Sequence, residues 1–238
     1  MKKVLFLLLF ASYFSHAQNK SIDFAFGEKY NYRLLIATKK STSGSEIVKK
    51  VRDGIEKPSF SQSYGIFLNK KIAEKQWLRF GLRYNPVTYI DKETDNVMWG
   101  SEHDGMGGWK PDPSLPHTLK LTRTYQYLDF TFAYRKMLSE KKWRSFFEIG
   151  IAPTVYLGTT LNILLGTDAS KIKRKEPDVN SFSMNIQYSY GVERDFGKNF
   201  SFVLQPTFYN YILPTSLKSS VKEFLVSGSL EVAVRYKL

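Results

Sequence analysis

The C-terminal stretch FLVSGSLEVAVRYKL, residues 224–238, alternates between two kinds of side chain along its length. Apolar residues such as Phe224, Val232 and Val234 share one face, and polar residues such as Glu231 and Arg235 share the other. A period of two residues is typical of a β-strand whose faces meet different surroundings. Because ordinary strands average about five or six residues, a longer one with an apolar face predicts the wall of a membrane-spanning β-barrel.

The same alternation recurs upstream and gives eight predicted strands. They start near Tyr30, Phe60, Trp77, Tyr125, Arg144, Phe182, Phe200 and Glu223. Short connections near 73–76, 139–142 and 197–199 alternate with longer ones over 40–59, 92–119, 165–181 and 214–222. This arrangement is typical of bacterial outer-membrane barrels. We therefore predict an all-β fold, an eight-stranded antiparallel up-and-down transmembrane barrel with short periplasmic turns and longer extracellular loops.

The polar faces of the predicted strands define the expected lumen. In a barrel within lipid the apolar face points outward and the polar face points inward. An eight-stranded barrel is just wide enough for side chains to fill its interior. The charged lumen candidates carry both signs, so we expect them to pair as an internal ion-pair plug and not to form a catalytic centre. They are Arg33, Arg79, Arg83, Glu148, Glu193, Glu231 and Arg235.

The N-terminus has the pattern of a secretory signal peptide. Lys2 and Lys3 precede an apolar run, which ends in the small residues Ser15 and Ala17 around His16. The run is shorter than the ~20 residues that a transmembrane helix needs. We predict a signal peptide over 1–17, a barrel domain over 18–238, and export to the outer membrane of a Gram-negative cell. The chain has no cysteine, which excludes disulfides and thiolate metal sites.

Two tryptophans suggest where the membrane begins. Trp77 and Trp143 each follow a short charged turn. Tryptophan is favoured at membrane–water interfaces. We therefore expect both side chains to be anchors at the periplasmic interface.

Three prolines fall inside predicted strands, where proline cannot donate a ladder hydrogen bond. They are Pro86, Pro153 and Pro206. Each lies roughly one membrane crossing beyond a short turn. We therefore expect all three to mark bulges near the outer rim.

The second long loop has the most unusual composition, with Trp99, His103, Asp104 and Trp109 in a glycine-rich stretch. His103 and Asp104 lack a second histidine at metal-ligand spacing. Together with Ser101 they contain the residue types of a hydrolase triad, but adjacency in sequence is not triad geometry. The sequence has no nucleophile-elbow or phosphate-loop motif. We expect no cofactor, metal or catalytic residue, and interpret the loop as a candidate extracellular binding loop.

The third long loop is basic, with Lys171, Lys173 and Arg174 close together, and the whole chain has a net charge of +13. An exported protein does not normally meet nucleic acid, so we expect no nucleic-acid partner. Outer-membrane lipids, above all lipopolysaccharide phosphates, or an anionic protein are the candidate partners. The alternative is an ordinary solvated hairpin.

The segment YLDFTFAYR, residues 127–135, and the ending VAVRYKL, residues 232–238, resemble the Bacteroidetes-type small outer-membrane β-barrels, described as porin-like or PorT-like. The resemblance covers residues 18–238. It implies a location and an architecture, and it carries over no catalytic residues. Some members serve the type IX secretion system, so another outer-membrane or secretion-system protein is a further candidate partner.

Together these patterns predict a non-enzymatic integral outer-membrane protein that acts as a membrane anchor, binding scaffold or accessory subunit of an outer-membrane assembly. Three alternatives stay open. The barrel could be a narrow porin-like channel for small solutes, which conductance would reveal. It could be a lipid-modifying enzyme that uses His103, or a soluble periplasmic barrel that needs no detergent.

Overall fold

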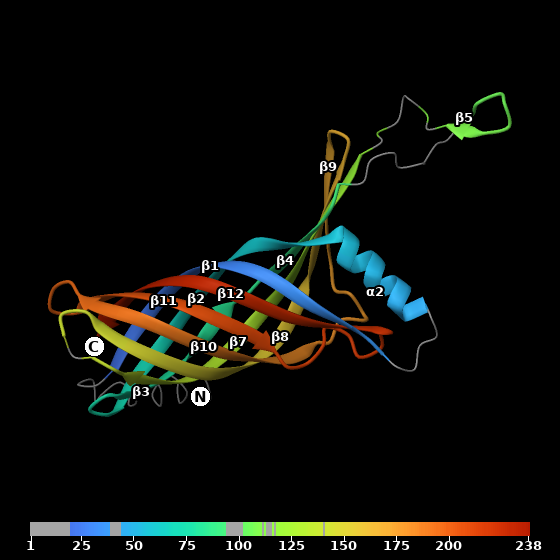
Figure 1. The fold of residues 1–238 in the computed structure, drawn as a ribbon. Helices are drawn as coiled ribbons and strands as arrows, with labels where there is room; N and C mark the ends of the chain where they lie inside the picture. The colour runs from blue at the N-terminus through green and yellow to red at the C-terminus, as the bar shows by residue number, and fades with distance from the viewer. Residues whose placement is uncertain are drawn as a thin grey trace, which may run out of the picture.

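A computed structural model describes residues 20–38, 44–93, 102–110, 112, 116, 118–139 and 141–238. The predicted signal peptide, residues 1–17, lies outside them. No helix in the described part is long and apolar enough to cross a membrane. Long antiparallel strands dominate the molecule (Figure 1). The elements are β1 (Lys20–Ala37), α2 (Gly44–Ile55), β2 (Glu56–Ala73), β3 (Gln76–Tyr84), β4 (Val87–Asp91), β5 (Glu102–His103), β6 (Trp109–Lys110), β7 (Leu119–Met137), β8 (Arg144–Leu165), β9 (Asp168–Arg174), β10 (Phe182–Asp195), β11 (Phe200–Tyr211) and β12 (Val221–Lys237).

The wall strands close into a ring. The last strand, β12, pairs with the first, β1, from Ser21 opposite Lys237 to Ala37 opposite Val221. β3 and β4 both pair with β2 and β7, so they act as one wall strand interrupted at Asn85-Pro86. The ring is therefore β1, β2, β3 with β4, β7, β8, β10, β11 and β12. This confirms the predicted eight-stranded antiparallel barrel, whose closure gives every wall strand two partners.

Most strand starts agree with the sequence pattern. β8, β10 and β11 begin at the predicted residues, whereas β1 begins at Lys20, well before the predicted Tyr30. Glu28 interrupts the row of apolar residues on the outward face of β1. The alternation is therefore not continuous through the first half of the strand. Pairing with β12 and β2 extends the strand through Glu28.

Three of the predicted long loops contain regular structure, which corrects the prediction; the segment 92–119 contains only the short pair β5 and β6. The segment 40–59 contains α2, whose Ile47, Val51 and Ile55 recur at helical spacing. The segment 165–181 contains β9, which forms a hairpin with the end of β8. Gly166, with φ of +56°, occupies the tight turn between them.

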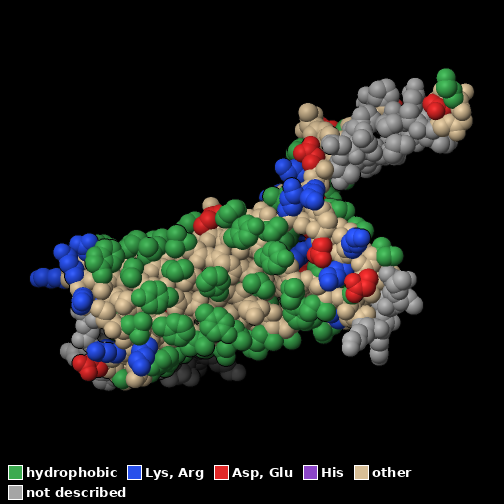
Figure 2. Space-filling model, viewed as in Figure 1, with side chains coloured by type: hydrophobic (Ala, Val, Ile, Leu, Met, Phe, Trp, Pro, Cys, Tyr) green, Lys and Arg blue, Asp and Glu red, His purple; other side chains and the backbone are tan. Residues whose placement is uncertain are grey.

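The two faces of the wall differ as predicted. Figure 2 shows apolar side chains covering the barrel wall, with Lys and Arg gathered toward its ends. Outward side chains such as Phe24, Ile66 and Leu230 are exposed, whereas inward ones such as Asp23 and Glu231 are buried. An apolar exterior around a polar interior is the arrangement that a lipid bilayer requires of a closed barrel. The chain is an integral β-barrel of the outer membrane.

The expectation that all three strand prolines mark bulges is wrong. Pro86 lies at the interruption between β3 and β4. Pro153 is paired with Met184 of β10, and Pro206 is paired with Leu230 of β12, with no register shift at either residue. Each of these two prolines is tolerated because the ladder pair is missing on only one side, toward β7 for Pro153 and toward β10 for Pro206.

The register shifts at two other places, between Lys71 and Ala73 of β2 beside a short turn, and between β7 and β8. The second of these is the bulge considered below. The register shifts between Gln126 and Tyr127, so that Gln126 is opposite Gly158 and Tyr127 is opposite Tyr156. Leu157 is the extra residue. Beyond this point β7, β8 and β9 form a sheet that extends past the barrel wall, in which β7 stays paired with the wall strand β4 as far as Thr122 (Figure 1). We call this sheet, residues 119–126, 158–165 and 168–174, the projection.

The polarity of β7 and β8 inverts at the bulge. Tyr125 is buried in the lumen and is opposite Thr159, so their shared face continues the inner face of the barrel. On the projection this inner face is mixed. It carries the aliphatic residues Leu119, Leu121, Leu161, Ile163, Leu165 and Ile172, and the polar residues Arg123, Asp168, Ser170 and Arg174. The outer face is mainly polar, with Lys120, Thr122, Thr124, Thr160, Asn162, Lys171 and Lys173; Leu164 and Ala169 are the apolar exceptions.

Candidate functional site in the barrel lumen

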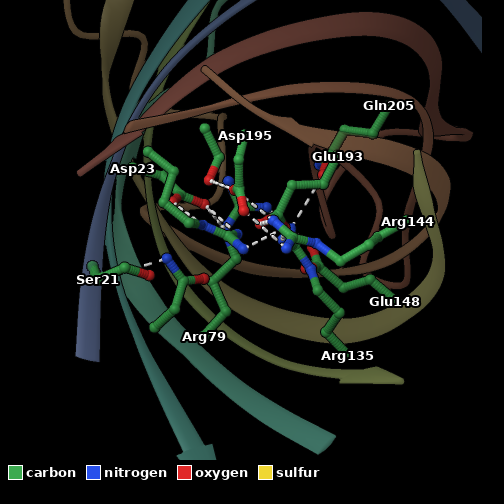
Figure 3. Close-up of polar contacts among 12 residues, drawn as sticks. Ser21, Asp23, Arg79, Arg135, Arg144, Glu148, Glu193, Asp195 and Gln205 are labelled. Carbon is green, nitrogen blue, oxygen red and sulfur yellow. Dashed lines mark hydrogen bonds and ion pairs between the residues drawn. The ribbon is translucent and has the colours of Figure 1, made fainter. Parts of the chain in front are cut away.

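The centre of the lumen is an ion-paired layer of arginines and one glutamate. Arg79 from β3 donates from Nη1 to Glu148 Oε1 at 2.9 Å, and Arg135 from β7 donates from Nε to Glu148 Oε2 at 2.8 Å. All three residues are only 1% exposed. Arg79 also lies over the ring of Phe67, with 3.7 Å from Cζ to the ring centroid. The inward faces of β3, β7 and β8 bring these side chains together (Figure 3).

A second group of ion pairs, formed by Arg235 and Arg144, lies beside this layer, toward the short turns. Arg235 donates from Nε and Nη2 to the two carboxylate oxygens of Asp23, at 2.7 and 2.9 Å. Arg235 also pairs with Glu193. Arg144 pairs with Glu193 at 2.8 Å and with Asp195 at 2.5 Å (Figure 3). Each arginine therefore contacts two carboxylates, and β1, β8, β10 and β12 are joined across the interior.

Farther toward the extracellular end, the lumen changes from ion pairs to a mixed polar and aromatic filling. Arg83 pairs with Glu231 at 2.9 Å, and the Tyr209 hydroxyl contacts both. Asp129 accepts hydrogen bonds from Asn85 at 2.5 Å and from Thr154 at 2.9 Å. Above them a cluster of buried aromatic and aliphatic side chains closes the lumen. Its members are Val87, Tyr89, Tyr125, Tyr127, Tyr156, Tyr209, Tyr211 and Leu225.

Helix α2 is attached to the extracellular rim by charged side chains. Arg52 of the helix donates to Glu56 at 2.8 Å and to Glu223 of β12 at 2.5 Å. Arg33 of β1 pairs with Glu56 and lies 3.5 Å from Glu223. Burial lowers the pKa of Arg52, but the hydrogen bonds to Glu56 and the charge of Glu223 outweigh it and raise that pKa above its usual value. The Arg52 guanidinium therefore stays positively charged at any physiological pH.

All seven predicted lumen residues are buried inside the barrel. The structure brings them into three groups: Arg33 at the rim, Arg83 with Glu231 in the middle, and the remaining four in the lower layers. Four further charged residues, not predicted from the sequence, are buried on the same inward faces: Asp23, Lys29, Asp129 and Arg135. Strand parity could have found Asp129 and Arg135, because both alternate with Phe130, Phe132 and Tyr134.

The two predicted tryptophan anchors behave differently. Trp143 is 47% exposed at the outer surface, with Arg194 over its ring. Trp77 does not point to the membrane interface, which corrects the prediction, because its ring packs against the interior cluster around Phe146. Trp77 shares the parity of Arg79, so the alternation of β3 turns it inward.

A cavity of about 530 Å³ lies at the end of the barrel that carries the short turns. Lys20, Trp77, Arg144, Glu193, Arg235 and Lys237 are among the residues that line it. Its charges are largely matched within the protein, since Arg144, Glu193 and Arg235 belong to the ion pairs described above. The cavity is therefore a vestibule that ends at the ion-paired layer.

The second long loop has two engaged polar residues. Asp104 accepts hydrogen bonds from the backbone N–H groups of Met106 and Gly108, at 2.7 and 2.8 Å, and His103 Nδ1 accepts one from Gly105. Trp99 lies outside the described residues, and of Trp109 the structure describes the backbone alone. Among the residues that the structure describes, no three His, Asp or Glu side chains are grouped as metal ligands.

The predicted basic loop is the β9 strand, on which all side chains are exposed. Lys173 is opposite Thr160 and Lys171 is opposite Asn162, so both lysines lie on the outer face of the projection. Arg174 is opposite Thr159 on the inner face, and it pairs with Glu176 at 3.6 Å. The three cations therefore do not form one patch.

No protein-family model and no curated protein matches the chain. Similar solved structures include Neisserial surface protein A, with 13% identity, 92% of this chain and 97% of that chain covered, and a TM-score of 0.44. The outer membrane protein OprG from Pseudomonas aeruginosa is 9% identical, with 93% of this chain and 98% of that chain covered and a TM-score of 0.39. The outer membrane protease OmpT from Escherichia coli is 8% identical, with 93% of this chain and 97% of that chain covered and a TM-score of 0.32. Likenesses of this size assign no activity to this chain. Its closed ring, apolar exterior and ion-paired interior make it a small outer-membrane β-barrel.

Proposed function

We propose that this protein is a closed, non-enzymatic anchor in the outer membrane, which holds the projection and α2 at the cell surface as a binding scaffold. The observation that carries the proposal is the central layer of Arg79, Arg135 and Glu148. Side chains of opposite sign from three strands meet there and are almost wholly buried. Because an eight-stranded barrel leaves room for little more than side chains, this filling supports a lumen that does not conduct.

The surroundings of the carboxylates support a structural role. Glu148 is held by two arginines, and Glu193 and Glu231 each accept from at least one more. A general acid or base has to reach the atom whose proton it transfers, whereas the oxygens of these carboxylates are occupied by guanidinium groups inside a filled lumen. His103 and Asp104 are engaged in the turn of their own loop. These contacts favour an anchor over an enzyme.

The elements beyond the membrane favour a binding role. The projection extends β7 and β8 past the bulge, and α2 is fixed at the rim by Arg52. Apart from the pairing of β7 with β4 at residues 122–125, neither element is needed to complete the ring of wall strands. The resemblance of residues 127–135 to Bacteroidetes-type barrels makes an accessory subunit of a secretion or outer-membrane assembly the narrower form of this proposal.

Conductance in planar bilayers tests the closed lumen. We expect the wild-type barrel to insert silently, and a variant with Arg79→Ser, Arg135→Ser and Glu148→Ser to give conductance steps. Lys141→Ser with Lys142→Ser, in the periplasmic turn, is the control and should stay silent. Steps from the wild-type protein would overturn the closed anchor in favour of the narrow channel.

Two further measurements address the rest of the proposal. Lipid A from cells that carry His103→Ala should have the same mass spectrum as lipid A from wild-type cells; a lost modification would replace the anchor with an enzyme. Purification in mild detergent by a tag after Gln18 should then show whether a stoichiometric companion makes the protein an accessory subunit. A lone, heat-modifiable monomer would count against the subunit form.

A further inference from the structure

The outer face of the projection continues the lipid-facing wall of the barrel. Below the bulge this wall is apolar on β8, with Ile151, Val155 and Leu157 pointing outward. Above the bulge the same side of the sheet carries Thr160 and Asn162. The neighbouring strand β9 places Lys173 beside Thr160 and Lys171 beside Asn162. On the outer face of β9, the cations nearest the apolar band are therefore these two lysines.

Their height above the apolar band matches the lipid headgroups. Leu157 is the last apolar residue of the band on β8, and Thr160 follows three positions later. At ~3.3 Å per residue and a strand tilt of about 35–45°, this separation is about 7–8 Å along the membrane normal. The headgroup layer of one leaflet is about 5–7 Å thick. Lys173 thus begins at the outer edge of this layer, and its long side chain can reach into it.

The two lysines are also available for a ligand. Both are exposed, and neither forms an ion pair within the part of the chain that the structure describes. Figure 2 shows Lys and Arg side chains gathered where the projection leaves the barrel. Arg174, one residue away on the opposite face, is paired with Glu176. The exposed Asn162 lies beside Lys171 in register, whereas Thr160, beside Lys173, is buried and accepts a hydrogen bond from Gln126.

We infer that Lys171 and Lys173 bind the phosphate groups of outer-leaflet lipid, with lipid A as the ligand. An ammonium group is a compact donor that suits a phosphate oxygen. Anionic lipid attracts each such cation near its surface. Binding here would hold the base of the projection against the membrane. The inference rests on the proposed function, since it names a ligand for one of the elements that the anchor presents.

Native mass spectrometry of the full barrel in mild detergent, titrated with diphosphoryl lipid A, tests the inference. Lys171→Gln with Lys173→Gln should weaken binding roughly thirtyfold, given the usual contribution of two lysines near an anionic surface. Lys141→Gln with Lys142→Gln removes the same charge from the short turn at the other end of β8 and should change affinity less than threefold. Arg174→Gln, on the opposite face of β9, should also leave it unchanged.

Three outcomes would overturn the inference. The first is an equal affinity for lipid A in the wild-type protein and the Lys171→Gln, Lys173→Gln variant. The second is an equal loss of affinity in the Lys141→Gln, Lys142→Gln control. The third is competition by millimolar inorganic phosphate as strong as competition by lipid A. The last result would assign the lysines to free phosphate. Bilayer conductance is measured on the same variants, so that a failure of lipid binding with a silent barrel would leave the closed anchor standing.

Discussion

The parts of β7 and β8 below and above the bulge use the same two strands with opposite polarity. Below it, Phe132 and Ile151 point outward and Arg135 and Glu148 point inward. Above it, most of the aliphatic side chains are on the inner face, and the outer face carries hydroxyl, amide and ammonium groups. β7 and β8 stay paired with each other here, with the register shifted between Gln126 and Tyr127. On their other sides, β8 exchanges β10 for β9, and β7 exchanges β3 for β4.

The difference follows from what surrounds each part. In the bilayer, an outward polar group would lose its hydrogen bonds to water, so the polar side chains are inside and pair with one another. Outside the bilayer, water satisfies the outer face, and the aliphatic side chains gather on the other face as in a soluble sheet. The bulge therefore marks the place where β7 and β8 leave lipid.

The largest expected effect comes from breaking the interior below the bulge. Glu148→Ala leaves Arg79 and Arg135 buried without their shared carboxylate, and removing one partner of a buried ion pair destabilises by about 3–5 kcal/mol. Asp23, 3.8 Å from Arg79, and Glu193, 4.0 Å from Arg135, favour the lower end of that range. Urea unfolding in lipid vesicles, followed by gel mobility, measures the change. A midpoint equal to that of the wild-type protein would show that the layer does not stabilise the barrel.

A matched pair of arginine substitutions on the outer face sharpens the boundary between the two parts. Ile151, 49% exposed, lies below the bulge, and Leu164, 40% exposed, lies above it. Ile151→Arg should reduce the free energy of unfolding by about 2–4 kcal/mol, because the charge enters hydrocarbon. Leu164→Arg should change it by less than about 0.5 kcal/mol, because the charge meets water. Similar losses in both variants would place Leu164 in lipid and move the boundary beyond the bulge.

The smallest expected effect is at the bulge itself. The Tyr156 and Thr159 hydroxyls are 2.6 Å apart inside the lumen, and Thr159→Val removes this hydrogen bond at a cost of about 1 kcal/mol. Hydrogen exchange should then speed up in residues 158–165 and stay unchanged in residues 146–154. Thr160→Val removes the hydroxyl that accepts a hydrogen bond from Gln126. It should have less effect, because the Gln126 amide is partly exposed and can donate to water instead. Faster exchange along the whole of β8 would mean that the two parts unfold together.

The sequence by itself determined the number of wall strands and their two faces. Each face of a membrane strand meets one kind of surroundings, so the alternation from Phe224 to Leu238 is readable without any contact across the chain. The same parity placed Arg79, Glu148 and Arg235 inside before their partners were known. It failed where a single residue such as Glu28 broke the column, and where Trp77 was judged by its residue type instead of its parity.

Tertiary structure decided which inward residues meet. Asp23 and Arg235 are far apart in the chain, and only the pairing of β1 with β12 makes them neighbours. The inversion at Gln126 likewise depends on which β8 residue is left over when β7 pairs with it. Strand periodicity is a local consequence of the surroundings of each side chain. Register and closure are properties of the whole ring, since shifting one strand changes every contact across the lumen.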